Sequence, residues 1–202
     1  FEEERDAGRA ALLEYANHPL FPHRPRARAA LAADDDPVDA VEVELPEIFS
    51  YAHRAIRTIM AVESALNLEE LHRKQAPLLS STLKDFIAEG TNTGAVVYLQ
   101  ALKMRLALQD ELDRFLTKYD AIITPPTTGE APATLEQTGN PTFCSIWSLC
   151  GVPAVTIPTG FGPHGLPLGL QIVGARGKDS QTLSAAHWCE GLFSFPCWRE
   201  KP

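Results

Sequence analysis

The sequence predicts an α/β protein whose helices come mainly in the first part of the chain and whose strands come mainly in the second. Residues 1–118 hold 6 of the 16 prolines and 3 of the 13 glycines, and residues 119–202 hold the other 10 of each. Apolar residues recur at helical spacing in the first part, whereas short β-branched runs between glycines and prolines fill the second. We therefore expect residues 1–46 to form a strand-and-loop lead-in, 47–118 to form helices, and 119–202 to form strands with a terminal helix.

Composition excludes several classes of protein. The 202 residues carry 18 Lys and Arg against 26 Asp and Glu, a net charge of −8, so no nucleic-acid partner is expected. No run approaches the ~20 apolar residues that a bilayer span requires, so no membrane partner is expected either. The four cysteines are too few for a disulfide scaffold and predict reduced thiols in a cytoplasmic protein. Because the chain begins at Phe1 without a signal segment, we expect it to start downstream of the gene's own start.

Residues 1–46 contain two candidate strands. Ala10 to Tyr15 is an apolar run that fits either a strand or a helix. Val41 to Leu45 alternates apolar residues with glutamates, which is the pattern of a half-buried strand, and Pro46 ends it.

Three helices are expected between residues 47 and 118. Apolar residues three and four apart predict one amphipathic helix from Ile48 to Asn67. A second helix covers Leu78 to Ala88, with Gly90 as its expected left-handed terminator. Thr93 is the expected N-cap of a third helix, which runs to Lys118.

The last section predicts strands joined by tight turns. Ala121 to Ile123 is a short apolar run typical of a buried strand. Val152 to Ile157 is β-branched and is expected to end at Pro158. Leu166 to Val173 returns as the second strand of a hairpin, and a terminal helix covers Asp179 to Leu192.

The cysteines of this section do not indicate a catalytic or metal site. Cys144 or Cys150 would need a lowered pKa and a nearby histidine, His164 or His187, to act as a nucleophile. Their spacing, without a second cysteine or histidine pair, gives no zinc pattern. Buried structural thiols are the simpler interpretation, and no metal is predicted.

The run from Thr142 to Pro158 is the best candidate for a binding site. An aromatic, helix-like segment leads to Gly151, and a buried strand follows directly. Such a junction often forms a pocket wall, because small residues let a ligand approach the backbone. Four side chains are the candidates for contact with a substrate: Phe143, Ile146, Trp147 and Cys150. Packing in the core explains the same residues, and the two alternatives stay open.

Three segments resemble the amidase signature family near its C-terminal end: Tyr119 to Pro126, Phe143 to Pro158, and Gly165 to Gly174. Their order and spacing fit the family as well. Val41 to Pro46 is similar to the strand that precedes the family's helical section, and the closing residues Trp198 to Pro202 are similar to its usual ending.

The resemblance implies an α/β/α arrangement in which helices cover a mixed central β-sheet, with this chain supplying its C-terminal portion. Family members hydrolyse C–N bonds with a serine nucleophile, a second serine in a cis peptide bond and a lysine, all in the N-terminal half. Here Ser80-Ser81 is the only adjacent serine pair, and no glycines surround it to shape an oxyanion site. Ser81 and Lys84 have a Ser-x-x-Lys spacing, but a polar helix surface explains it. No catalytic residue is carried over, and the isolated chain is expected to be inactive.

The implied partners are a small-molecule amide substrate and the missing N-terminal half of the amidase domain. The resemblance implies no cofactor. The sequence does not decide between a monomer and a homo-oligomer. The amidase-like A subunit of a tRNA-dependent amidotransferase is the alternative within the resemblance, although residues 143–149 lack an arginine for a glutamine carboxylate. A non-catalytic binding module that kept this half of the fold is the alternative from another class.

Overall fold

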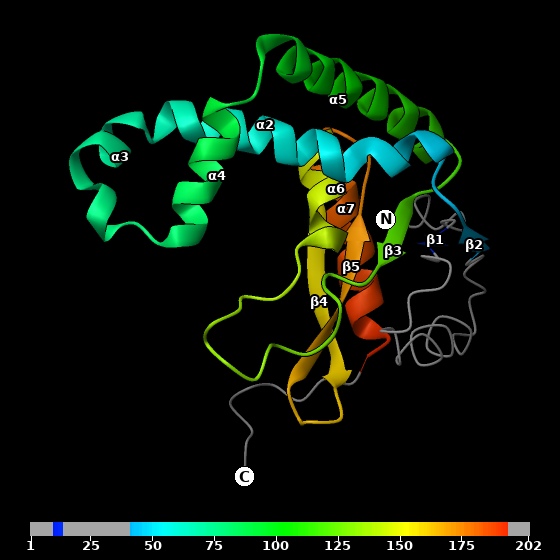
Figure 1. Cartoon of the computed structure of the whole chain (residues 1–202). Helices are drawn as coiled ribbons and strands as arrows, with labels where there is room; N and C mark the ends of the chain where they lie inside the picture. Colours follow the sequence, from blue (N-terminus) through cyan, green and yellow to red (C-terminus); the bar gives the residue numbers. More distant parts are fainter. Residues whose placement is uncertain (1–9, 14–40, 194–202) are drawn as a thin grey trace. The chain divides into compact units, whose positions relative to one another are not determined.

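The structure, a computed structural model, describes residues 10–13 and 41–193 (Figure 1). The chain divides into two compact units: a helical unit of residues 47–110, and a sheet unit formed by residues 1–46 together with 111–202. The family-like ending at Trp198 to Pro202 lies outside the described residues.

The described residues of the sheet unit form one mixed β-sheet. Its strands are β1 (Ala10–Leu13), β2 (Val41–Val43), β3 (Ala121–Thr124), β4 (Ala154–Phe161) and β5 (Pro167–Val173). Their order is β2-β1-β3-β5-β4. The first three strands run parallel, whereas β5 is antiparallel to both β3 and β4. The predicted mixed sheet is confirmed, and the segment after residue 9 is a strand and not a helix.

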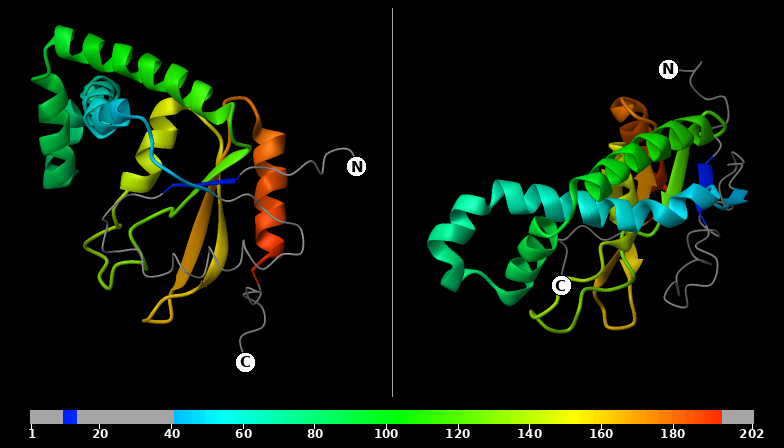
Figure 2. Two further views of the ribbon diagram at one scale, coloured as in Figure 1. Left: turned by 90° about the vertical axis from the view of Figure 1, so that its right-hand side faces the viewer. Right: turned by 45° about the horizontal axis from the view of Figure 1, so that its top comes forward.

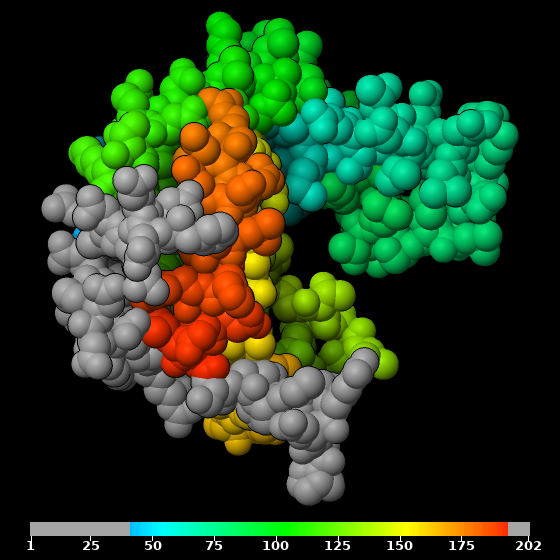
Figure 3. Space-filling model, turned by 180° about the vertical axis from the view of Figure 1, so that it is seen from behind, coloured from blue at the N-terminus to red at the C-terminus, as the bar shows by residue number. Residues whose placement is uncertain are grey.

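Two helices cover opposite faces of this sheet, α6 (Thr142–Cys150) and α7 (Asp179–Gly191) (Figure 2). Because side chains alternate along a strand, each of β3, β4 and β5 supplies one set of residues to each face. The face under α7 is apolar, and α7 lies over it at the surface of the molecule (Figure 3). Its buried core consists of Ala121, Ile123, Ile157, Leu170, Ile172, Ala186 and Cys189.

The strand β4 is longer than the sequence predicts. It begins after Pro153, but it continues through Pro158 to Phe161, with an irregularity in its pairing to β5 between Pro158 and Gly160. A proline is tolerated there because β4 is the last strand of the described sheet, and its outer edge has no neighbour that needs the missing N–H. The prediction that Pro158 ends the strand is therefore wrong.

The helical unit contains η1 (Glu47–Tyr51), α2 (Ala52–Asn67), α3 (Glu69–Gln75), η2 (Ala76–Leu78), α4 (Ser81–Thr91) and most of α5 (Ala95–Leu116). The three predicted helices are confirmed as α2, α4 and α5. The short helix α3 was not predicted, because it is mostly polar and buries none of its residues, so it carries no apolar stripe. Within the described residues, none of the helices has the length and apolar run needed to cross a bilayer.

Two predicted helix ends in this unit are wrong. Gly90 does not terminate α4 but lies inside it, buried against α2, where an added Cβ would come within 1.9 Å of the Ala61 carbonyl oxygen. Thr93 is not the N-cap of α5, because α5 begins at Ala95 and Gly94 precedes it, whereas the Thr93 hydroxyl donates a hydrogen bond back to the carbonyl of Glu89 at 2.8 Å. Gly90 is thus required for the close crossing of two helices and not for a left-handed turn.

Candidate functional site

Local hydrogen bonds define both ends of α6. At its start, the Asn140 side-chain oxygen accepts hydrogen bonds from the backbone N–H of Thr142, at 2.9 Å, and from the Thr142 hydroxyl. At its end, Gly151 adopts a left-handed conformation with φ of 67°, and its N–H donates to the Trp147 carbonyl at 2.9 Å. This conformation favours glycine, and it turns the chain into β4 within three residues. The predicted helix-to-strand junction at Gly151 is confirmed.

The four predicted substrate-contact residues lie together on the buried face of α6. Phe143, Ile146, Trp147 and Cys150 are each no more than 5% exposed. Ser148 is exposed on the opposite face of the helix, and Cys144 and Ser145 are half-buried. Their burial is what the packing alternative predicts for this chain, and contact of any of them with a substrate stays a prediction.

A polar layer lies between α6 and the sheet. Thr124 on β3 and Gln171 on β5 are directly opposite each other, and both are almost fully buried. The Gln171 amide donates to the Cys144 sulfur at 3.5 Å, and the Cys144 thiol donates to the Pro126 carbonyl at 2.9 Å. These contacts connect α6 to the sheet and to the loop after β3.

This layer also contains polar atoms without a hydrogen-bond partner among the described residues. They are the Thr124 hydroxyl and the Gln171 side-chain oxygen, and the indole nitrogen of Trp147 on α6 is a further buried atom of this kind. Unpaired buried polar atoms are costly and uncommon in native proteins, so the layer differs from the apolar face under α7. Composition and residue spacing do not predict this polar layer, and its one signal in the sequence is the lone glutamine in the apolar run of β5.

The thiol of Cys150 is unsuited to nucleophilic chemistry. Burial, reinforced by the negative charge of Asp113 and opposed by Arg176, raises its pKa to about 12. A reactive cysteine requires a lowered pKa, because the thiolate is the nucleophile. Cys144, Cys150 and Cys189 form no disulfide, which agrees with structural thiols.

The remaining candidate groups do not form a nucleophile–base pair either. His164 contacts Glu130, with 2.6 Å between its Nδ1 and a carboxylate oxygen, and His187 lies 3.9 Å from the Glu190 carboxylate. Ser81 and Lys84 belong to the first turn of α4, and Ser80 caps that helix by accepting a hydrogen bond from the Leu83 N–H. Within the described residues, no group of three His, Cys, Asp or Glu side chains is placed to hold a metal ion.

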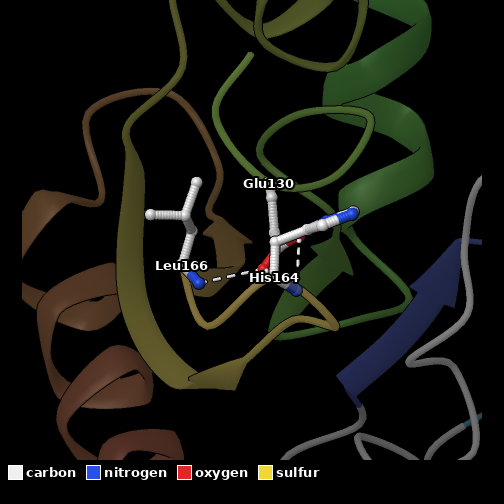
Figure 4. A network of polar contacts seen from close by, with 3 residues as sticks. All are labelled: Glu130, His164 and Leu166. Atoms are coloured by element: carbon white, nitrogen blue, oxygen red, sulfur yellow. Dashed lines mark hydrogen bonds and ion pairs between the residues drawn. The ribbon is translucent and has the colours of Figure 1, made fainter. Parts of the chain in front are cut away.

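A half-buried carboxylate joins the loop before α6 to the β4–β5 hairpin (Figure 4). The Glu130 side chain is 9% exposed, and its oxygens accept hydrogen bonds from the backbone N–H of Leu166 at 2.9 Å and of His164 at 3.1 Å. This role of Glu130 is not predictable from the sequence, because nothing in a single sequence pairs Glu130 with a turn 34 residues away.

The comparison with protein families agrees with the architecture described above. A family model described as amidase matches residues 25–183. This chain belongs to the amidase signature family. An amidase family segment accounts for the mixed sheet, the two covering helices and the α6–Gly151–β4 junction together.

Curated relatives of this amidase segment include the A subunits of several glutamyl-tRNA(Gln) amidotransferases. The protein from Halothermothrix orenii is 33% identical over 110 residues, which cover 52% of this chain and 23% of the relative. The protein from Dehalococcoides mccartyi is 40% identical over 98 residues, which cover 45% of this chain and 20% of the relative. The matched region is thus about a fifth of each relative's length.

Solved structures resemble this amidase segment over almost its whole length. A crystal structure of an amidase matches with a TM-score of 0.76 and 22% identity, over 93% of this chain and 46% of the other. A 6-aminohexanoate cyclic dimer hydrolase matches with a TM-score of 0.73 and 20% identity, over 94% and 46%. The glutamyl-tRNA(Gln) amidotransferase protein from Thermotoga maritima matches with a TM-score of 0.62 and 25% identity, over 87% and 40%. The chain therefore spans less than half the length of these proteins.

Proposed function

We propose that this chain acts as the C-terminal part of an amide hydrolase that cleaves C–N bonds by serine acyl transfer. The match to the amidase family over residues 25–183 carries the proposal. In this proposal the chain supplies strands of the central sheet, the covering helices and one wall of the substrate pocket, whereas the N-terminal half of the amidase domain supplies the nucleophile.

The roles proposed for this chain and for the N-terminal half follow from the chemistry of acyl transfer. Acyl transfer requires a serine with an adjacent base, which attacks the amide, releases the amine and leaves an acyl-enzyme that water then hydrolyses. Ser81, the best serine candidate in the sequence, is an exposed residue in the first turn of α4, and Ser80 beside it caps the same helix. We therefore propose that this chain binds and orients the acyl part of the substrate and does not attack it.

The first test is the activity of the isolated 202-residue chain. We expect no hydrolysis of simple amides or esters and no labelling by a fluorophosphonate, which reacts with activated serines, because the serine–serine–lysine group is missing. The complete protein should be labelled and active under the same conditions. Turnover by the isolated chain that disappears in Ser81→Ala or Cys150→Ala would contradict this prediction.

The second test asks whether Trp147 touches the substrate. If it does, Trp147→Ala in the complete enzyme should change the ranking of short and long acyl amides in kcat/KM, because a lost apolar contact alters selectivity by ~1–3 kcal/mol. If Trp147 only packs, the variant should lose ~3–5 kcal/mol of stability and keep the ranking. Trp188→Ala on α7, where Trp188 is 38% exposed, is the matched control. A large loss of melting temperature with an unchanged ranking would remove Phe143, Ile146, Trp147 and Cys150 from the pocket.

The second candidate function is that of the amide-donating component of a tRNA-dependent amidotransferase. The identities of 33% and 40% to curated proteins of that kind favour it. The absence of an arginine from residues 143–149 opposes it, because a glutamine carboxylate is commonly bound by that side chain. Glutamine hydrolysis by the complete protein, measured beside a panel of simple amides, separates the two functions.

We also propose a cytoplasmic location. The described cysteines form no disulfide, as expected in a reducing compartment. Fractionation of cells that express the complete protein tests this location.

A further inference from the structure

We propose that Glu130 is a positioning residue. In this proposal its carboxylate binds the backbone of the β4–β5 turn, fixes the loop of residues 125–141, and thereby holds the N-terminal end of α6 in place. The effect on substrate rests on the proposed amide hydrolase function, whereas the effect on the loop does not.

The backbone donors of the turn show how the carboxylate is bound. Gly162 donates its N–H to the Leu166 carbonyl at 2.9 Å, and Gly165 donates to the Gly162 carbonyl at 3.0 Å. Pro163 has no N–H. The two donors that remain, on His164 and Leu166, both point to the carboxylate, and the His164 ring adds a third contact at 2.6 Å (Figure 4). Without this carboxylate, the turn would have two backbone N–H groups with no protein acceptor.

Gly162 provides the space that this contact requires. A Cβ at this position would lie 2.3 Å from the carboxyl carbon of Glu130 and 2.4 Å from one of its oxygens. The φ of Gly162 lies outside the left-handed region, so the glycine is needed for space and not for its torsion. Any larger side chain would displace the carboxylate from the turn.

Further contacts connect Glu130 to α6. The Thr127 hydroxyl donates to the Asn140 carbonyl at 3.3 Å. This hydrogen bond joins the two ends of the loop, which are 13 residues apart. Asn140 in turn caps α6 through Thr142, and the Cys144 thiol bonds to Pro126 at the other end of the loop. Glu130 thus lies within a closed loop whose two ends both contact the start of α6.

The ionisation of Glu130 supports this role. Burial acts to raise its pKa, but the hydrogen bond from the His164 ring, those from the N–H groups of Leu166 and His164, and the charge of His164 together lower it below its ordinary value. The side chain is therefore a carboxylate at neutral pH, and hydrogen bonds to a charged acceptor are stronger than those to a neutral one.

Loss of this contact should alter substrate binding more than the chemical step. Glu130 does not touch the reacting atoms in this proposal, so its removal should loosen the wall formed by α6 and raise KM while kcat changes less. Removing the Glu130 carboxylate and filling the space at Gly162 should have the same effect, because both changes break the contact between the carboxylate and the β4–β5 turn.

The experiment measures amide hydrogen exchange and kinetics in the complete protein for Glu130→Ala, Gly162→Ala and the double variant. We expect exchange at the amides of His164 and Leu166, and at those of Cys144 and Ser145 in the first turn of α6, to accelerate about tenfold in either single variant. The double variant should be no worse than either single one, because the two residues act in one contact. Glu136→Ala, which removes an exposed carboxylate from the same loop, is the control and should match the native protein.

Four outcomes would overturn the proposal or part of it. Unchanged exchange in Glu130→Ala, or additive effects in the double variant, would show that no such contact positions the loop. Faster exchange at the turn alone, with α6 unchanged, would refute the link to the helix. Faster exchange at both sites with native KM and native substrate ranking would reduce Glu130 to a structural role. If the native protein hydrolyses no amide, the proposed function fails, and the exchange data still decide whether Glu130 holds the loop and α6.

Discussion

Cys150 and Cys189 carry thiols whose pKa values burial raises to about 12 and about 11. Both side chains are almost fully buried, whereas Cys144, whose sulfur contacts Pro126 and Gln171, is half-buried. At pH 8 the two buried cysteines are protonated and shielded from solvent, and both consequences of burial protect them from alkylation. We therefore expect the two thiols of α6 to differ in reactivity, because Cys144 is half-buried and Cys150 is almost fully buried.

We predict that iodoacetamide at pH 8 modifies Cys144 before Cys150 and Cys189 in the folded protein, as measured by peptide mass spectrometry. Because the folded-state pKa values are raised, the protected thiols should become reactive only well above pH 10 or after unfolding. Denaturation in urea is the control and should remove the difference. Modification of Cys150 at the rate of Cys144 in the native protein would show that α6 is not packed as described.

At the level of elements, the crossing of α2 and α4 depends on Gly90. The atom that a Cβ would meet is a backbone carbonyl, which cannot rotate away as the end of a flexible side chain can. Arg57 on α2 and Glu89 on α4 add an exposed ion pair beside the crossing at 2.6 Å, and such pairs contribute at most about 1 kcal/mol. Close backbone packing, and not this ion pair, is the constraint that specifies the crossing.

We predict that Gly90→Ala destabilises the protein by ~1–3 kcal/mol, the usual cost of forcing extra volume into a packed site. Alanine has a better helix propensity than glycine by about 1 kcal/mol. A net loss of stability would therefore mean that the steric clash with the Ala61 carbonyl costs more than this gain. Gly191→Ala is the matched control, because Gly191 ends α7 and an added Cβ there meets nothing within 4 Å. Thermal unfolding measures both variants. A Gly90→Ala protein as stable as the native one would show that the helices separate at no cost.

The elements were predictable where local patterns decide them, and not where tertiary contacts do. Periodic apolar residues located α2, α4 and α5, and β-branched runs located β3, β4 and β5. The predictions for Gly90 and Pro158 are wrong because they treat each residue as the end of its own helix or strand. Their actual roles depend on a neighbouring helix in one case and on the edge of the sheet in the other.

The candidate site was predictable only in part, for the same reason. The junction at Gly151 could be inferred because a helix-like run, a glycine and a strand are adjacent in the sequence. The pairing of Thr124 with Gln171, and the contact of Glu130 with residues 164 and 166, join segments more than 30 residues apart. A single sequence contains no signal for such pairs, since each depends on the register of the sheet and on the path of a loop.

At the scale of the whole molecule, the outer face of α5 carries an apolar stripe. Val96, Leu99 and Leu106 lie on one side of the helix and are 68%, 55% and 55% exposed. The chain spans less than half the length of the solved structures that it resembles. Exposed apolar stripes and unpaired strand edges promote association, so we expect the 202-residue chain, expressed alone, to form oligomers or aggregates.

Size-exclusion chromatography with light scattering, together with binding of a hydrophobic dye, tests this last prediction. If the stripe on α5 contributes, Leu99→Glu with Leu106→Glu should shift the chain toward monomer and reduce dye binding. Gln181→Glu with Ser184→Glu on α7 adds the same two charges at exposed polar positions, and should leave association unchanged. A clean monomer that binds no dye would argue against an amidase segment that needs its N-terminal half. It would favour the self-sufficient binding module, because such a module must cover its own apolar surface to remain monomeric.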